Sequence, residues 1–346
     1  MKGLLLIGLF LIGCSDNFEP APDCNDCGLE LYASNLQIES DGSYKLEYNQ
    51  DLTQTYTMLD ATTDCGWSQH LQWETDYPDP VEGLAAGEMD PRHRKLVEKI
   101  EAQRAQNPEF QTMHFASADT PEECVLLHSL AFNGVQLGFE CMLEPYQSWY
   151  QSSNLLPMYK YYLELLKMLQ WRRPGDRWLL KAPAHMWGLD SLIRVMPDAC
   201  ILWGHRDPLQ VIPSISSLTA MAAKMFAGHI PAMEKDKLGP LVMEFYARSL
   251  ERGIATRSKI APKHFFDYRF KDFVGKPLTL ISDAYDFFKL PLDDELKNCF
   301  SNYIEQHPKG KHGNHRYTFE TFGLTEAIIL ERFDFYYQHP VYSHYL

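Results

Sequence analysis

Basic residues are scarce in this chain. Its 346 residues include 32 lysines and arginines against 46 aspartates and glutamates, which gives a net charge of −14. Proteins that bind nucleic acid need clustered positive charge, so this balance argues against a nucleic-acid partner. The sequence also lacks an internal repeat and a low-complexity tract. With 45% hydrophobic and 23% charged residues, it predicts a folded globular protein of about two domains.

The N-terminus lacks an apolar run of about 20 residues, the length that spans a bilayer. Met1-Lys2 is followed by a shorter apolar run, Gly3 to Gly13, which is typical of a signal sequence. Leu11-Ile12-Gly13-Cys14 fits the lipobox of bacterial lipoproteins, in which Cys14 becomes the lipid-anchored first residue after cleavage. A plain secretory signal cut nearby is the alternative. The predicted location is therefore exported and membrane-anchored, or cytoplasmic or Golgi-facing if this N-terminus has another role.

The segment that follows differs in character from the rest of the chain. Leu36 and Ile38 alternate with polar residues before Asp41-Gly42, and Tyr44 and Leu46 do so after it, which predicts a β-hairpin. Further β-like runs cover 53–59 and 70–73. The predicted organisation is a signal or lipobox over 1–14, a linker over 15–28, a small β-rich module over 29–77 and an α/β domain over 78–346.

The cysteines fall into two groups. Cys24 and Cys27, with Cys65, could form a disulfide in an exported segment. A metal site would need more ligands than lie nearby. No metal is therefore expected. The later cysteines lie in predicted helices or strands and are expected to be small buried apolar residues: Cys124, Cys141, Cys200 and Cys299.

Two apolar runs end on cationic side chains. The first covers Trp178 to Leu180 and is followed by Lys181; the second covers Ala199 to Gly204 and is followed by His205-Arg206. An amphipathic helical stretch separates the runs, so the order strand, helix, strand predicts a parallel α/β unit. Ligands bind at the carboxyl ends of such strands. The cations there predict an anionic ligand.

The same stretch resembles the nucleotide-binding region of the sulfotransferase superfamily, in particular its large bacterial-type family. The blocks that carry the resemblance are Leu180-Lys181-Ala182-Pro183-Ala184-His185 and His205-Arg206-Asp207-Pro208, with Ser214 eight residues after Arg206. Over residues 78 to 335 it continues through Asp90-Pro91-Arg92, Pro121-Glu122-Glu123-Cys124, Leu169-Gln170-Trp171-Arg172, Asp267-Tyr268 and the basic loop from Lys309 to Tyr317. The resemblance implies a P-loop-NTPase-like fold, in which a three-layer parallel sheet is flanked by helices.

The resemblance also implies a chemistry, the transfer of a sulfuryl group from 3′-phosphoadenosine-5′-phosphosulfate to an acceptor hydroxyl. Arg206 and Ser214 would hold the 3′-phosphate, Arg206 with a planar fork suited to phosphate. Ser214, at a predicted helix start, could instead be an N-terminal cap. Lys181 is the candidate to neutralise charge on the leaving oxygen, by analogy with phosphoryl transfer, or it is a solvated lysine at a strand end.

Other residues have more open roles. His205 and His185 could contact the nucleotide or the acceptor, or be hydrogen-bonded structural residues. The basic loop would close over the donor, or be an ordinary solvated loop; its cations are Lys309, Lys311 and Arg316. A base must remove the acceptor's proton, and the candidates are Glu74 and His114. The acceptor is the hydroxyl of a small molecule, glycan or peptide.

The family's first strand and phosphate loop have no visible counterpart. The corresponding position, Asp51 to Thr57, has no glycine and no basic residue, so the expected fold lacks its first strand and loop and is preceded by the β-rich module. An inactive or anion-binding exported lipoprotein with a truncated sulfotransferase-like domain is the alternative function. A nucleotide kinase of similar architecture is set aside, because it needs a Gly-x-x-x-x-Gly-Lys-Ser/Thr loop.

Overall fold

The computed structural model describes residues 8–13, 36–38, 44–46, 67–68, 72–76, 78, 90–106, 117–118, 122–140, 143–172, 177–226, 235–306 and 318–345. Within these ranges no helix is long and apolar enough to cross a membrane.

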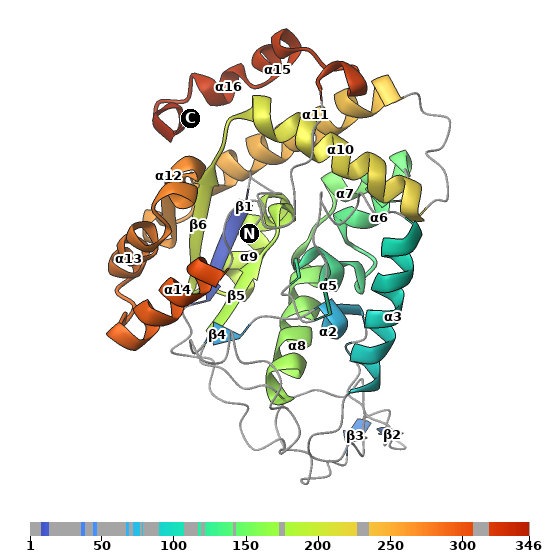
Figure 1. Cartoon of the computed structure of the whole chain (residues 1–346), viewed down its shortest axis with the longest axis vertical. Coiled ribbons are helices and arrows are strands. Elements are labelled where there is room, and N and C mark those ends of the chain that lie inside the picture. Colours follow the sequence, from blue (N-terminus) through green and yellow to red (C-terminus); the bar gives the residue numbers. More distant parts are fainter. Residues whose placement is uncertain are drawn as a thin grey trace.

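A five-stranded sheet lies at the centre of the molecule (Figure 1), in the order β4-β5-β1-β6-β7. The strands are β4 (Trp67–Ser68), β5 (Arg177–Lys181), β1 (Gly8–Gly13), β6 (Ala199–His205) and β7 (Phe265–Arg269). β4 pairs in parallel with β5, and β6 pairs in parallel with β7. The expected α/β class is confirmed, and so are the two strands that end beside cationic residues, β5 at Lys181 and β6 directly before Arg206.

β1 corrects two expectations about the sheet. It lies between β5 and β6 and is antiparallel to both, so the sheet is mixed rather than wholly parallel. The central position, expected to lack a strand, is occupied by part of the apolar run predicted as a signal sequence. Gly8 pairs with Gly204 and Gly13 with Ala199. The chain therefore leaves β1 at the edge of the sheet opposite to His205.

Helices cover both faces of the sheet. Along β6, Ile201 and Trp203 belong to one apolar core, and Cys200 and Leu202 belong to another, because successive side chains of a strand point to opposite faces. The first core includes α8 (Leu156–Arg172), α9 (Leu189–Val195), α10 (Pro208–Phe226) and α11 (Lys235–Arg257). The second includes α12 (Phe270–Gly275), α13 (Pro277–Phe288) and α14 (Asp294–Gln306).

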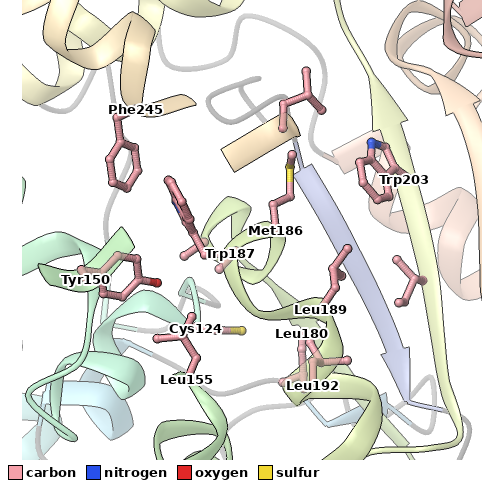
Figure 2. Close-up of a cluster of buried hydrophobic side chains, with 14 of the residues drawn as sticks. Cys124, Tyr150, Leu155, Leu180, Met186, Trp187, Leu189, Leu192, Trp203 and Phe245 are labelled. Atoms are coloured by element: carbon pink, nitrogen blue, oxygen red, sulfur yellow. The ribbon is translucent and has the colours of Figure 1, made fainter. Parts of the chain in front are cut away.

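The larger core fills the space between β5, β6 and the helices that follow them. Figure 2 shows Leu180 and Trp203 pointing toward Met186, Leu189 and other apolar side chains beside β1. Apolar residues recur at helical spacing along α8, and all of them are buried in this core: Met158, Tyr162, Leu165 and Leu169.

Shorter elements complete the description. They are α2 (Gln72–Asp76), α3 (Pro91–Gln106), α5 (Val125–Ser129), α6 (Val135–Glu140), α7 (Glu144–Ser152), α15 (Glu326–Arg332) and α16 (Asp334–Tyr337), with 3-10 turns η2 (Pro183–Gly188), η3 (Pro262–His264), η4 (Glu320–Phe322) and η5 (Tyr342–Tyr345). The predicted hairpin is confirmed as β2 (Leu36–Ile38) paired with β3 (Tyr44–Leu46). The β-like run over 70–73 is wrong at its end, because α2 begins at Gln72.

The cysteines divide differently from the prediction. Cys124 is a buried free thiol, as expected. Cys200 on β6 and Cys299 on α14 are instead disulfide-bonded, which the apolar character of their surroundings did not reveal. Cys14, Cys24, Cys27, Cys65 and Cys141 lie outside the described residues.

Candidate functional site

Lys181 ends β5, and its ammonium group forms an ion pair with the Glu123 carboxylate. The side chains are partly buried, with 24% of Lys181 and 12% of Glu123 exposed. Two hydrogen bonds, one between backbone groups and one to a side-chain sulfur, fix the Glu123 segment against the strand. The Cys124 N–H donates to the Lys181 carbonyl at 3.0 Å, and the Lys181 N–H donates to the Cys124 Sγ at 3.2 Å. The charged pair is therefore held at the carboxyl end of the strand.

Behind this pair lies a buried polar and aromatic cluster. His185 is fully buried, and its Nδ1 lies 2.8 Å from the Tyr159 hydroxyl. The His128 ring meets the Tyr162 and His185 rings edge-on, with centroid distances of 4.8 and 5.0 Å. Burial raises the pKa of the Cys124 thiol to about 12, so this thiol is neutral. The structure thus places His185 in the core beneath the strand end.

His205 ends β6 and is held at both ring nitrogens. Its Nε2 lies 2.8 Å from the Asp267 Oδ1, and its Nδ1 lies 2.7 Å from the Tyr336 hydroxyl. A carboxylate only accepts hydrogen bonds, so Nε2 carries the proton and Nδ1 accepts from Tyr336. The rings of Tyr342 and Tyr345 stack on the imidazole. This environment matches the structural alternative for His205 and leaves its contact with a nucleotide a prediction.

Asp267 on β7 links His205 to Arg257 of α11. The guanidinium donates two hydrogen bonds to the carboxylate, at 2.6 and 2.5 Å. Burial raises the pKa of the Asp267 carboxyl, but the hydrogen bonds from Arg257 and His205 outweigh it, and the pKa is below its ordinary value. Arg257 also lies over the Phe265 and Trp203 rings. The network ties β6, β7 and α11 together at this edge.

Arg206 follows β6 directly and contacts the first turns of α10. Its guanidinium lies 4.9 Å from the centroid of the Phe270 ring, and its Nε donates to the Gln210 Oε1 at 3.2 Å. Residues four apart lie on the same face of a helix, so Gln210 and Ser214 share one face of α10. The hydrogen bond to Gln210 places Arg206 at the start of the same stripe. Ser214 is half-buried there, eight residues from Arg206 as the motif requires.

The expected position of Ser214 at a helix start is wrong. α10 begins at Pro208, and its cap is Asp207, whose Oδ1 accepts from the Leu209 N–H at 2.9 Å. The Tyr337 hydroxyl donates to the same oxygen at 2.6 Å. A carboxylate therefore occupies the N-terminus of α10, and a phosphate would have to be held by the stripe rather than by this helix end.

The sheet register relates the two strand ends. Phe10 of β1 pairs with both Lys181 and Leu202, so Lys181 is level with Leu202. Arg206 lies four residues further along, roughly 13 Å at about 3.3 Å per residue. The two cations thus lie at the same edge of the sheet but are displaced from one another along the strand direction.

The remaining candidates are only partly placed. Glu74 is buried on α2, which packs against α3 and α5. His114, Lys309, Lys311 and Arg316 lie outside the described residues, so their roles stay predictions. In the part of the chain that the structure describes, no group of three or more His, Cys, Asp and Glu side chains is arranged to hold a metal ion.

Sequence reasoning missed two residues at this edge. Glu123 belongs to the Pro121 to Cys124 block that contributed to the resemblance, and this block was the signal that could have identified it. Gln210 lies midway between Arg206 and Ser214, at the helical spacing that could have identified it.

The fold and this edge define an α/β protein with cationic side chains at the carboxyl ends of two of its strands. The chain belongs to the sulfotransferase family, because the model of the family described as "Sulfotransferase family" matches residues 53–294. The match begins inside the segment predicted as a β-rich module. The bacterial-type resemblance is thereby confirmed, and it supports an enzyme.

Solved structures agree on the fold. The chain is similar to sulfotransferase STF9 from Mycobacterium avium, with a TM-score of 0.69, 22% identity and coverage of 81% of this chain and 72% of that one. Sulfotransferase STF1 from Mycobacterium tuberculosis H37Rv gives a TM-score of 0.66 and 24% identity, covering 81% and 74%.

Curated relatives point to the same family. They are the omega-hydroxy-beta-dihydromenaquinone-9 sulfotransferases Stf3 of Mycobacterium bovis and Mycobacterium tuberculosis, each 24% identical over 204 residues, 53% of this chain. The match covers 52% of each relative, so the chain spans about half the length of the curated relatives it matches.

Proposed function

We propose that this chain transfers a sulfuryl group from 3′-phosphoadenosine-5′-phosphosulfate to an acceptor hydroxyl. The observation that carries the proposal is the pair of cations at one edge of the sheet, Lys181 at the end of β5 and Arg206 directly after β6. The donor bears a phosphate on one side of its ribose and a phosphosulfate on the other. Two cations at different heights along the strands suit such a ligand.

The chemistry makes modest demands on the protein. The bond from sulfur to the bridging oxygen of the donor breaks while a bond from sulfur to the acceptor oxygen forms, and negative charge develops on the departing phosphate. Positioning and cationic stabilisation supply most of the catalysis in the related transfer of phosphoryl groups. Lys181 would stabilise the departing phosphate, and Arg206, Gln210 and Ser214 would hold the 3′-phosphate.

The acceptor is proposed to be a small molecule with a free hydroxyl. The mycobacterial relatives act, by their names, on an omega-hydroxylated menaquinone. A hydroxylated menaquinone is therefore the first acceptor to test, before hydroxyls of glycans and peptides. The proposed use of the basic loop at Lys309, Lys311 and Arg316 to cover the donor rests on the resemblance alone.

Calorimetry with 3′,5′-adenosine bisphosphate tests the donor site on the full chain. Arg206→Ala removes charge-assisted hydrogen bonds to the phosphate, and the expected loss of affinity is about 10- to 100-fold. Arg194→Ala removes the same charge from an exposed position on α9 and should leave binding unchanged. Absence of wild-type binding at millimolar nucleotide would refute the proposal, and equal binding by Arg206→Ala would refute this site.

A second candidate function is non-catalytic, an exported anion-binding lipoprotein. The direction of β1 favours it, because β1 ends with Gly13 at the edge of the sheet opposite to Lys181. Nucleotide binding without transfer of labelled sulfate to any acceptor or to water would support this candidate over the first.

A further inference from the structure

Among the residues that the structure describes, Glu123 supplies the one carboxylate in direct contact with Lys181, the lysine at the candidate site. The two side chains come from segments 58 residues apart in the sequence. The hydrogen bonds between Cys124 and Lys181 fix the backbone beneath them. The contact is therefore built into the fold and is not a chance encounter of two long surface side chains.

An ion pair at this place poses a problem for a donor that is itself an anion. The Lys181 ammonium group can neutralise the departing phosphate only if it faces the donor. The Glu123 carboxylate would repel that same anion while it remained alongside. Lys181 must therefore exchange its carboxylate partner for the donor, and the exchange releases a carboxylate next to the reacting groups.

We propose that Glu123 is the catalytic base of the sulfuryl transfer, released when the donor takes its place on Lys181. The inference rests on the proposed function. The acceptor hydroxyl gives its proton to the Glu123 carboxylate as its oxygen bonds to sulfur. The bond from sulfur to the bridging oxygen breaks with its electron pair, and Lys181 stabilises the oxyanion that leaves. No oxidant, reductant or further reactant is needed.

The groups around Glu123 are consistent with this role. Lys181 faces it from β5, and the Glu122 Oε1 accepts a hydrogen bond from the Glu123 backbone N–H at 2.7 Å. Burial, and then the charge of Glu123, raises the pKa of Tyr246 on α11, and burial raises the pKa of Cys124. Tyr246 and Cys124 are thus neutral near pH 7 and are poor bases.

The earlier base candidates fit less well. Glu74 is buried on α2, 6% exposed. His114 lies outside the described residues. Donor-first binding follows from the mechanism, because Glu123 becomes available to the acceptor only after the donor has displaced it.

The test compares Glu123→Gln with the wild-type full chain. Transfer from ³⁵S-labelled donor to a hydroxylated menaquinone is counted, with sulfate released to water counted in parallel. Loss of a general base is expected to lower kcat at least about 100-fold. Affinity for 3′,5′-adenosine bisphosphate should be equal or higher, because a carboxylate no longer competes for Lys181. The fall of wild-type kcat at low pH should be absent from the residual activity of the variant.

Two further variants separate chemistry from structure. Glu123→Asp retains a carboxylate and should recover part of kcat together with the fall at low pH. Glu164→Gln disrupts the exposed pair with Lys167 and should leave kcat, affinity and pH profile unchanged. A Glu123→Gln variant that loses nucleotide binding, or keeps kcat, would overturn the inference while leaving the proposed function intact. A wild-type chain that transfers sulfate neither to the acceptor nor to water would overturn both.

Discussion

At the scale of single residues, the edge of the sheet separates groups that support the fold from groups that are available to a ligand. His205 has both ring nitrogens hydrogen-bonded to other side chains and is 1% exposed. Lys181 and Arg206 are more exposed and each has a partner that an anion could replace. Two adjacent residues of one motif, His205 and Arg206, therefore differ in burial and in partners.

The state of His205 leads to a prediction about stability. Burial lowers the pKa of the folded imidazole below its ordinary value of 6.5, although the Asp267 hydrogen bond opposes the shift. The unfolded chain therefore binds a proton at higher pH than the folded chain, and the stability that the neutral ring confers is lost as pH falls below 6.5 toward the folded pKa. We expect the free energy of unfolding in urea to decrease from pH 7 to pH 5.

In His205→Gln this decrease should be smaller. The substitution itself should cost about 1–3 kcal/mol at pH 7, because Asp267 and Tyr336 lose a buried partner. His344→Gln, at an exposed position of η5, should behave as the wild type. An equal slope between pH 7 and pH 5 in all three chains would show that His205 does not titrate as its burial implies.

Residue chemistry could be predicted only where it is local. The strand-end lysine, the His205-Arg206 pair and the spacing to Ser214 are visible in the sequence because each belongs to one continuous segment. The ion pair of Glu123 with Lys181 and the links from Asp267 to Arg257 and His205 could not be predicted from the sequence. They depend on how segments far apart along the chain are brought together.

At the scale of elements, β6 and β7 approach closely near the site. A Cβ placed on Gly204 would lie 2.6 Å from the Tyr268 hydroxyl oxygen and 2.7 Å from its ring. Tyr268 is 5% exposed, and burial raises the pKa of its hydroxyl. The glycine immediately before His205 thus lets the ring of the neighbouring strand pack against the backbone.

Gly204→Ala should therefore destabilise the chain. The added methyl group meets a buried ring that has little room to move, and overpacking of this kind costs about 1–3 kcal/mol. Gly275→Ala is the matched control, because a Cβ there meets nothing within 4 Å. Urea unfolding of both variants measures the difference. If the two substitutions had the same effect, the packing of Tyr268 on Gly204 would not constrain the strands.

Elements were predictable in type but not in direction. The sequence alone predicts helices over 277–289 and 293–305 and a strand over 265–270, because periodicity and flanking prolines fix them locally. The structure has them as α13, α14 and β7. The apolar run before Cys14 has no such direction signal. A strand and a signal sequence share the same composition, and only its pairing with β5 and β6 identifies it as an antiparallel strand.

At the scale of the whole molecule, two features bear on where the chain resides. Cys200 and Cys299 are disulfide-bonded, and disulfides persist mainly in oxidising compartments; export of the chain stays a prediction. The lipobox prediction requires cleavage before Cys14, and that cleavage would remove β1. A chain that is lipidated at Cys14 therefore cannot keep β1 in its sheet.

Because β1 supplies hydrogen-bonding partners to both β5 and β6, we expect a chain that begins at Cys14 to lose cooperative unfolding. The removal of β1 leaves two strand edges unpaired in the middle of the sheet, and each unsatisfied buried backbone group costs about 1–3 kcal/mol.

Leu11→Pro removes one backbone donor from the centre of β1 and should lower Tm without shortening the chain. Scanning calorimetry of both variants, with the mass of the natively produced chain, decides the matter. An unchanged Tm in the shortened chain, or a native mass beginning at a lipidated Cys14, would make β1 dispensable and favour the lipoprotein.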